Sequence, residues 1–275
     1  MILDVYALPA FLPECSKFPN SYDRGVAIDV LRATTVITTA LAAGASRVVP
    51  FVSVEETLEA KKTWVQGVLA EHPQEEPQVL LGGERKGVRI AGFDMANSPA
   101  DYSSEVVAGK TIFFSTTNGT KAILSGAAKQ MVVASFLNAN TIVRFLNDSP
   151  EETKIAIVCA GTDGQTTTED LLLAGCLVDR VANAHTETPV AFNLQAETVR
   201  QMWREVLRSF FDFHPKSRHD IHTDAFYRHL ESVLRKSRGG ANVVRIGLDH
   251  DIADAARIDS LDVLPVLRDN SLVAE

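Results

Sequence analysis

Short apolar segments rich in β-branched residues alternate with longer amphipathic segments along most of this 275-residue chain. The strand-like segments are Gly25–Val30, Arg47–Val52, Gln78–Leu81, Lys110–Ser115, Gln130–Phe136, Lys154–Cys159 and Thr188–Phe192. The helix-like segments are Arg32–Ala43, Val54–Leu69, Glu169–Ala184, Leu194–Phe210 and Thr223–Lys236. Apolar strands separated by helices are typical of a sheet that is covered on both faces. We therefore predict a layered α/β/α fold with a mixed or largely parallel sheet.

The chain shows no Gly-, Ser- or Pro-rich linker that would separate two domains. The polar segments Glu71–Gln78 and Asn147–Thr153 are short enough to be surface loops. We expect one domain over residues 1–275; if it has two lobes, their boundary lies near residues 147–153.

Charge and composition exclude several classes of protein. The chain has 35 acidic and 27 basic residues, a net charge of −8, and ordinary fractions of hydrophobic (45%) and charged (23%) residues. Such a composition excludes disorder. Because phosphate contacts need clustered basic residues, and the longest basic groupings here are pairs, nucleic acid is not an expected partner.

Cysteine usage and the apolar segments bear on the compartment. Cys15, Cys159 and Cys176 are odd in number and form no Cys-x-x-Cys pair, so neither a disulfide framework nor a zinc ribbon is expected. Residues 1–13 are apolar but lack the basic start of a signal peptide, and no run is long enough to span a membrane. We expect a cytoplasmic protein with no membrane partner.

Polar residues gather directly after four of the predicted strands, where ligands bind in open α/β sheets. In the first cluster, Asp29 has the chemistry of a hard-cation ligand, Arg32 is suited to an anion, and Thr34 and Thr35 add hydroxyl groups. Taken alone, this cluster is better explained by Asp29 capping the next helix and Arg32 pairing with it locally.

The second cluster follows the predicted strand Gln78–Leu81. Gly82 and Gly83 allow close backbone approach, and the residues after them carry both signs of charge, at Glu84, Arg85 and Lys86. Opposite charges beside glycines suit a metal ion with an anionic substrate. A solvated turn is the alternative explanation.

The third and fourth clusters follow Lys110–Ser115 and Lys154–Cys159. The third offers neutral donors, which suit either a phosphate or the start of a helix: Thr116, Thr117, Asn118, Gly119 and Thr120. In the fourth, Thr166 and Glu169 fit a capping box, but this leaves Asp163 unexplained. A divalent-metal site would account for Asp163, Glu169 and Asp170 together.

Spacing excludes several familiar phosphatase and nucleotide-binding motifs. A Cys-x5-Arg loop starting at Cys159 would need arginine where Gln165 stands, and an Asp-x-Asp motif at Asp29 would need aspartate at Leu31. Cys159 is better explained as a small core residue at a strand end. His214, His219 and His222 are close in sequence, but their spacing matches no strong metal motif.

Taken together, the loops resemble the ComB-type 2-phosphosulfolactate phosphatases. The matching stretches, in the family order, are Ala27–Thr35, Gly82–Arg85, Gly92–Asp94, Asn97–Pro99 with Tyr102, Thr116–Thr120, Cys159–Gly164, Glu169–Leu172, Ser237–Gly240, and Gly247–Leu248 through Asp251–Ile252. Each match is modest, but their common order is specific.

This resemblance implies the ComB fold and a Mg²⁺-dependent phosphatase that converts 2-phospho-3-sulfolactate to 3-sulfolactate and phosphate, the reaction type of coenzyme M biosynthesis. The implied metal ligands are Asp29, Glu84, Asp163, Glu169 and Asp170, of which two or three would contact the ion. The implied substrate ligands are Arg32, Thr34, Thr35, Arg85, Thr117, Asn118, Gly119 and Thr120. Catalysis is expected to involve Asp29, Arg32, Glu84 and Asp163.

The expected partner is a small anionic phosphoester, and a homodimer is left open. Two alternatives remain: an anion-binding module without turnover, and a metal-dependent phosphotransferase acting on another small phosphoester. Paired acids near the ligand speak against a pure anion binder, because like charges would repel it.

Overall fold

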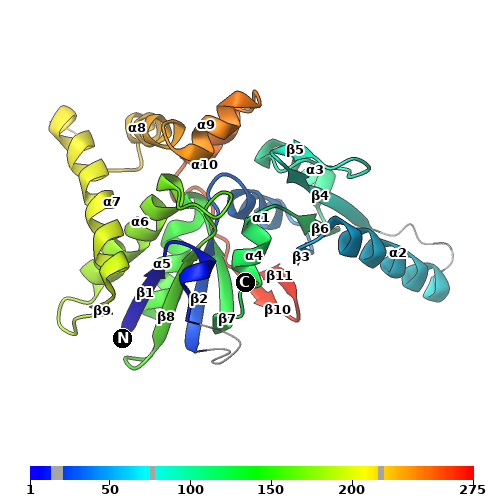
Figure 1. Cartoon of the computed structure of the whole chain (residues 1–275), viewed down its shortest axis with the longest axis horizontal. Helices are drawn as coiled ribbons and strands as arrows, with labels where there is room; N and C mark the ends of the chain where they lie inside the picture. The colour runs from blue at the N-terminus through cyan, green and yellow to red at the C-terminus, as the bar shows by residue number, and fades with distance from the viewer. Residues whose placement is uncertain (14–20, 73, 75–77, 216–219) are drawn as a thin grey trace.

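A computed structural model describes residues 1–13, 21–72, 74, 78–215 and 220–275. Within these residues, eleven strands form one sheet in the order β5-β4-β6-β3-β11-β10-β7-β2-β8-β1-β9 (Figure 1). The strands are β1 (Ile2–Tyr6), β2 (Tyr22–Ile28), β3 (Arg47–Phe51), β4 (Val79–Arg85), β5 (Val88–Arg89), β6 (Thr111–Ser115), β7 (Ala128–Ala134), β8 (Lys154–Cys159), β9 (Ala191–Phe192), β10 (Pro265–Arg268) and β11 (Ser271–Ala274). The predicted mixed, largely parallel sheet is confirmed.

The sheet consists of two parallel sets of strands joined by an antiparallel hairpin. Strands β4, β6 and β3 run parallel to one another, as do β7, β2, β8, β1 and β9. The hairpin β10–β11 lies between the sets, with Val266 of β10 opposite Val132 of β7, and Leu272 of β11 opposite Val48 of β3. The last two strands of the described chain thus complete the middle of the sheet.

Helices cover both faces of this sheet, as the layered prediction requires. The helices are α1 (Ala33–Ala42), α2 (Val54–Glu71), α3 (Ser104–Val107), α4 (Gly119–Ile123), α5 (Ala139–Asn147), α6 (Thr168–Ala184), α7 (Leu194–Phe213), α8 (Asp224–Arg235), α9 (Arg238–Arg245) and α10 (His250–Ala255). Alternate residues of β2 point to opposite faces: Val26 and Ile28 pack in the core with α5 to α8, and Ala27 packs in the core with α1 and α4. Helix α2 packs separately against β4 and β6, through Trp64 and Phe113.

The seven predicted strands and five predicted helices are all present, most with small differences at their ends. Strand β4 extends to Arg85, so the prediction that Gly82–Arg85 follow the strand as a loop is wrong. The predicted strand Thr188–Phe192 forms only at its last two residues; Pro189, which has no N–H to donate, lies before it. Strand β1 and the hairpin were not predicted. The lobe boundary near 147–153 stays a prediction; these residues connect α5 to β8.

No helix in the described ranges is long and apolar enough to cross a membrane. A cytoplasmic location and a homodimer stay predictions.

Candidate active site

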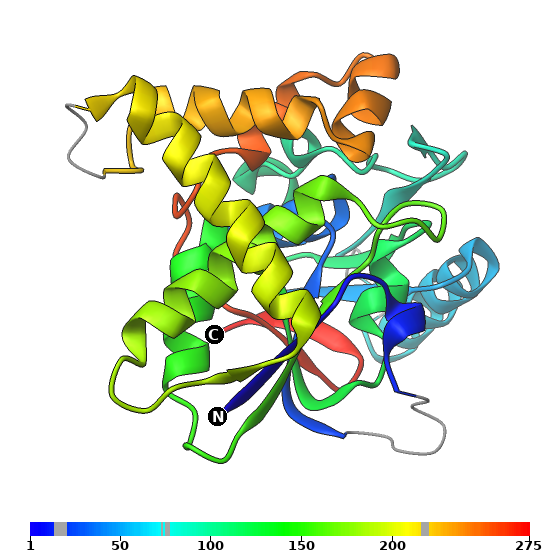
Figure 2. The same ribbon diagram turned by 60° about the vertical axis from the view of Figure 1, so that its left-hand side comes forward.

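A cavity of about 390 Å³ opens at the carboxyl ends of β2, β4, β6 and β8. In Figure 2, helices α8 and α9 lie across the top of the molecule, and α9 forms one wall of the cavity. The lining residues are Asp29, Leu31, Arg32, Glu84, Lys86, Gly87, Asn97, Thr117, Asn118, Thr162, Asp163, Gly239, Asn242, Val243, Arg245 and Ile246. The four loops singled out in the sequence therefore meet at one place, between the two sets of parallel strands.

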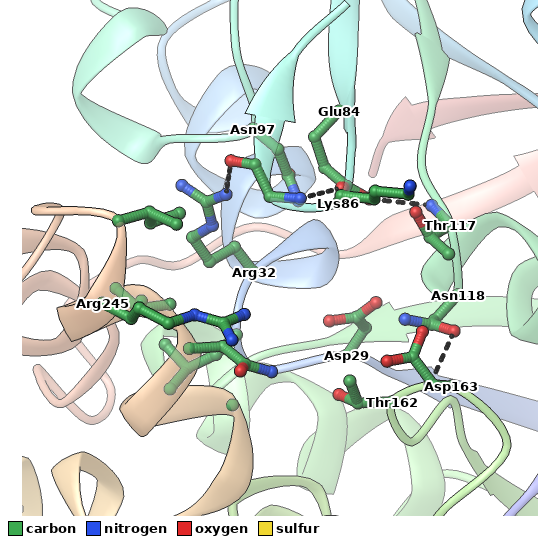
Figure 3. Close-up of a pocket in the computed structure, with 16 residues that line it drawn as sticks. Asp29, Arg32, Glu84, Lys86, Asn97, Thr117, Asn118, Thr162, Asp163 and Arg245 are labelled. Atoms are coloured by element: carbon green, nitrogen blue, oxygen red, sulfur yellow. Dashed lines mark hydrogen bonds between the residues drawn. The ribbon is translucent and has the colours of Figure 1, made fainter.

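Asp29 is the first polar residue after the apolar end of β2, and its carboxylate points into the cavity (Figure 3). Its backbone is clamped by Thr34, which accepts a hydrogen bond from the Asp29 N–H at 3.0 Å and donates its hydroxyl proton to the Asp29 carbonyl at 2.8 Å. The Asp29 Oδ1 atom accepts the Ala33 N–H at 3.3 Å, but the N-cap of α1 is Arg32, so Asp29 is not the predicted helix cap.

Glu84 ties the loop after β4 to the loop after β6. Its Oε1 accepts the Thr117 N–H at 2.8 Å and its Oε2 accepts the Gly87 N–H at 2.6 Å. Lys86 lies between Glu84 and Gly87 in the sequence and has a φ of 54°. This left-handed conformation is uncommon outside glycine and strains the backbone. This conformation belongs to the tight turn that brings Lys86 to the cavity.

The loop after β8 brings Thr162 and Asp163 to the opposite side of the cavity (Figure 3). Asp163 also has a positive φ, of 53°, and its N–H donates to Asn118 Oδ1 at 3.3 Å. Its carboxylate is two-thirds exposed and lies 3.8 Å from the Arg238 guanidinium. Two strained residues that are not glycine therefore border the same cavity.

Arg32 is buried and held in one orientation by groups distant in sequence. Its Nη1 donates to Asp251 Oδ2 at 2.9 Å, and its Nη2 donates to the Gly87 carbonyl at 3.0 Å. Asp251, on α10, is completely buried and also accepts the Ser98 hydroxyl at 2.5 Å. The local ion pair between Arg32 and Asp29 that was considered from the sequence is therefore wrong, because Arg32 forms its ion pair with Asp251.

Glu169 does not belong to a capping box. Helix α6 begins at Thr168 with Thr167, not Thr166, as its N-cap, and no side chain caps it. The Glu169 carboxylate lies instead against Gly239 of α9, where an added Cβ would come within 2.0 Å of Oε1. Its other oxygen, Oε2, is buried without a hydrogen-bond partner. A side chain at residue 239 would therefore force the Glu169 carboxylate to shift.

Burial and neighbouring acids raise the proton affinity of Asp29. Burial, together with the negative charges of Glu84 and Glu169, raises the pKa of Asp29 to about 7, against the hydrogen bond from Ala33 that lowers it. Burial likewise raises the pKa of Glu169. The site thus concentrates more buried negative charge than its own cations compensate.

Several predicted site residues lie behind the cavity wall rather than in it. These are Thr34, Thr35, Arg85, Gly119, Thr120, Glu169 and Asp170. Arg85 donates to the carbonyls of Glu84 and Val52 and to the Ser115 hydroxyl. The two carboxylate oxygens of Asp170 accept the N–H groups of Val30 and Gly161, at 2.8 and 3.0 Å. Burial raises the pKa of Asp170 well above the ordinary value.

The remaining residues behind the wall hold the loops in place. Thr35 and Thr120 donate their hydroxyl protons to the backbone carbonyls of Val30 and Thr116. Gly119 packs so closely that an added Cβ would lie 2.6 Å from Asp29 Oδ2. The predicted residues that line the cavity itself are Asp29, Arg32, Glu84, Thr117, Asn118 and Asp163.

The cavity also contains residues that sequence reasoning did not assign to it: Lys86, Asn97, Thr162, Asn242 and Arg245. Asn97 is 4% exposed, and its Oδ1 has no hydrogen-bond partner. Lys86 and Asn97 stood in motifs already singled out, but no spacing signal points to Asn242 and Arg245, because α9 is brought to the cavity only by tertiary packing.

The cysteine and histidine candidates lie elsewhere. Cys159 is fully buried in the core, and burial raises the pKa of its thiol well above the ordinary value, so it is a packing residue. His214 stacks on the Phe210 ring at 4.4 Å between centroids, and His222 lies 3.9 Å from Asp259. His219 lies outside the described residues.

The fold and the cavity together define a class of protein: an α/β protein with carboxylates and basic side chains at the carboxyl ends of its strands, where open α/β sheets bind their ligands. The sequence matches the family described as 2-phosphosulpholactate phosphatase over residues 9–270. The chain therefore belongs to the 2-phosphosulfolactate phosphatase (ComB) family of phosphoric monoester hydrolases.

Individual relatives agree with this assignment. The chain is 38% identical to a probable 2-phosphosulfolactate phosphatase of Symbiobacterium thermophilum over 249 residues, 90% of this chain and 92% of the relative. It is 32% identical to one of Caldanaerobacter subterraneus subsp. tengcongensis over 88% of this chain and 87% of the relative. A third, of Clostridium perfringens, is 45% identical over 57% of this chain and 60% of the relative.

Proposed function

We propose that this protein hydrolyses 2-phospho-3-sulfolactate, or a closely related 2-phospho-hydroxyacid, to the hydroxyacid and inorganic phosphate, as in coenzyme M biosynthesis. The observation that carries the proposal is the cavity itself. Carboxylates and basic side chains line the same cavity, in a chain of a phosphatase family whose relatives are named for this substrate.

The chemistry of the site also fits a divalent cation. Among the described residues, no three acidic, histidine or cysteine side chains lie close enough to hold a metal ion by themselves. Mg²⁺ needs fewer, because it commonly binds one or two carboxylates and completes its shell with water and substrate phosphate. The raised pKa of Asp29 and the unpartnered Oε2 of Glu169 both indicate negative charge that a cation would compensate.

Asp29 is the residue we propose to hold Mg²⁺, with Glu84 as a further oxygen donor that lines the same cavity. Glu169 would add to the local negative charge from behind Gly239. Asp170 is left out of the set because it does not line the cavity, unlike Glu84, whose two oxygens also accept backbone N–H groups. When bound, the ion would neutralise phosphate oxygens and make the phosphorus easier to attack.

The chain's own residues would do the rest. Lys86 lies beside Glu84 and Thr117 and would bind a phosphate oxygen as a point charge (Figure 3). Arg32, fixed by Asp251 and Gly87, keeps donors for the substrate and would stabilise charge in the transition state. Asp163, largely exposed at the cavity, would accept the proton of the attacking water.

Phosphate release tests this proposal directly. We expect turnover of 2-phospho-3-sulfolactate in the presence of Mg²⁺ and none after addition of a chelator. The metal is tested separately by thermal unfolding, in which Mg²⁺ should raise the midpoint of the wild type by several degrees but not that of Asp29→Asn.

Each result contradicts a different statement. Failure to release phosphate from 2-phospho-3-sulfolactate, 2-phospholactate and phosphoglycolate would overturn the phosphatase proposal. Phosphate release that continues in the presence of the chelator would contradict the proposed metal dependence but not the phosphatase activity.

A further inference from the structure

The cavity is divided electrostatically between its two sides. In Figure 3, Asp29 and Asp163 lie on one side, and the guanidinium groups of Arg32 and Arg245 lie on the other. Lys86 lies near the acidic side, next to Glu84. A ligand that carries anionic groups at both ends therefore has one favourable orientation, with its metal-seeking group beside Asp29.

The two guanidinium groups differ in how much of their charge is already compensated. Arg32 is 4% exposed and forms an ion pair with the buried Asp251. Arg245, in the last turn of α9, is exposed, and none of the ion pairs formed by described residues involves it. Arg245 is therefore the guanidinium whose charge and planar donor set are available to a ligand.

Helix α9 fixes the place of Arg245 along the cavity. Ser237 caps the helix by accepting the Gly240 N–H at 3.0 Å, and Gly239 packs against the Glu169 side chain. Four residues of the helix and its end, Asn242, Val243, Arg245 and Ile246, then form one wall. The guanidinium thus stands on a helix anchored behind the acids, across the cavity from them (Figure 3).

We propose that Arg245 binds the second strong anion of the substrate, the sulfonate, and so gives this enzyme its preference for 2-phospho-hydroxyacids that carry a sulfonate. This inference rests on the proposed phosphatase function. The phosphoryl group lies between Asp29 and Lys86, and the sulfonate lies on Arg245. A sulfonate presents two oxygens that match the guanidinium fork, as a carboxylate or phosphate does.

The test compares two substrates that differ only in the sulfonate. For Arg245→Gln, we expect kcat/KM for 2-phospho-3-sulfolactate to fall about 30-fold, and kcat/KM for 2-phospholactate to change less than about 3-fold, since a charged hydrogen bond is lost with only one of them. Arg245→Lys keeps the positive charge but loses the planar set of guanidinium donors, so its kcat/KM for 2-phospho-3-sulfolactate should lie between the values of the wild type and Arg245→Gln. Arg228→Gln, which removes an exposed arginine of α8 outside the cavity, is the matched control and should change neither value.

Equal losses with both substrates, or no loss with either, would overturn the assignment of Arg245. Calorimetric binding of 3-sulfolactate and of lactate separates this inference from the proposed function. If the wild type releases no phosphate but binds 3-sulfolactate more tightly than lactate, and Arg245→Gln abolishes that difference, the phosphatase proposal fails and the sulfonate site stands. If the wild type binds neither compound, the sulfonate site is also wrong.

Discussion

Asp29 is a buried carboxylate whose neighbours make its charged form costly. Its pKa of about 7 lies far above the ordinary value of 3.8, chiefly because of burial and then because of the charges of Glu84 and Glu169. Such a residue lowers the stability of the metal-free protein at neutral pH, and buried groups with shifted pKa values of this kind are typical of functional sites.

The sign of this effect gives a pH prediction. Between pH of about 4 and about 7, the unfolded chain releases the Asp29 proton while the folded protein keeps it, so the free energy of unfolding falls as the pH rises. Asp29→Asn removes this loss. We expect the metal-free variant to be about 4 kcal/mol more stable than the wild type at pH 8, with no gain at pH 4.

Urea unfolding at both pH values in the presence of a chelator measures the difference, and phosphate release should be lost in the same variant. A stability difference that does not depend on pH would show that Asp29 is not the group whose proton affinity is raised. Asp163→Asn is the matched control, because it makes the same substitution at a largely exposed carboxylate of the same cavity.

Asp251 has the opposite role, since it compensates a buried charge. Asp251→Asn would leave the Arg32 guanidinium buried without an ionic partner, and we expect a loss of about 3 kcal/mol in the free energy of unfolding. Asp249→Asn breaks the half-exposed pair with Arg235 and should cost less than about 1 kcal/mol. Equal losses in the two variants would contradict the importance of the buried pair.

At the scale of elements, the hairpin β10–β11 joins the two sets of parallel strands. Leu272 is fully buried opposite Val48, so we expect Leu272→Ala to lower the free energy of unfolding by about 3 kcal/mol. Val273→Ala, at the partly exposed neighbouring position, should cost about 1 kcal/mol or less. Denaturant unfolding followed by fluorescence and by circular dichroism should show one transition for both probes, and separate transitions would mean that the two sets unfold independently.

Elements with a clear hydrophobic pattern in their own sequence could be predicted, and elements that depend on pairing with distant strands could not. Strands such as β8 are continuous apolar runs and were predicted with their observed bounds. The hairpin was not predicted, because its strands are four residues long and half-buried, and what makes them strands is their pairing with β7 and β3. Helix α9 was not predicted, because two glycines and two β-branched valines in eight residues lower its helix propensity.

The site could be predicted where it depends on chain order and could not where it depends on packing. Residues directly after strands, such as Asp29 and Asp163, reached the cavity as expected, because parallel strands end at the same edge of the sheet. Arg245 and Asp251 come from helices far along the chain, and nothing near them in sequence shows where they pack. Conversely, Arg85 and Asp170 had suitable chemistry but are engaged by the backbone.

For the whole molecule, the net charge of −8 and the anionic ligand are compatible because charge is distributed unevenly. The cavity gathers basic side chains at Arg32, Lys86 and Arg245 beside its acids. The overall charge therefore describes the surface that faces solvent, whereas the arrangement inside the cavity determines which ligand is held and in which orientation.

The position of the hairpin also affects how the chain is made. Strands β3 and β7 leave the ribosome well before β10 and β11, which are the strands that pair with them. Until then, a growing chain carries two unpaired strand edges, which are templates for association with other chains. Strands β10 and β11 therefore pair with both edges and protect the sheet from aggregation. A chain whose translation pauses before residue 265 keeps both strand edges unpaired.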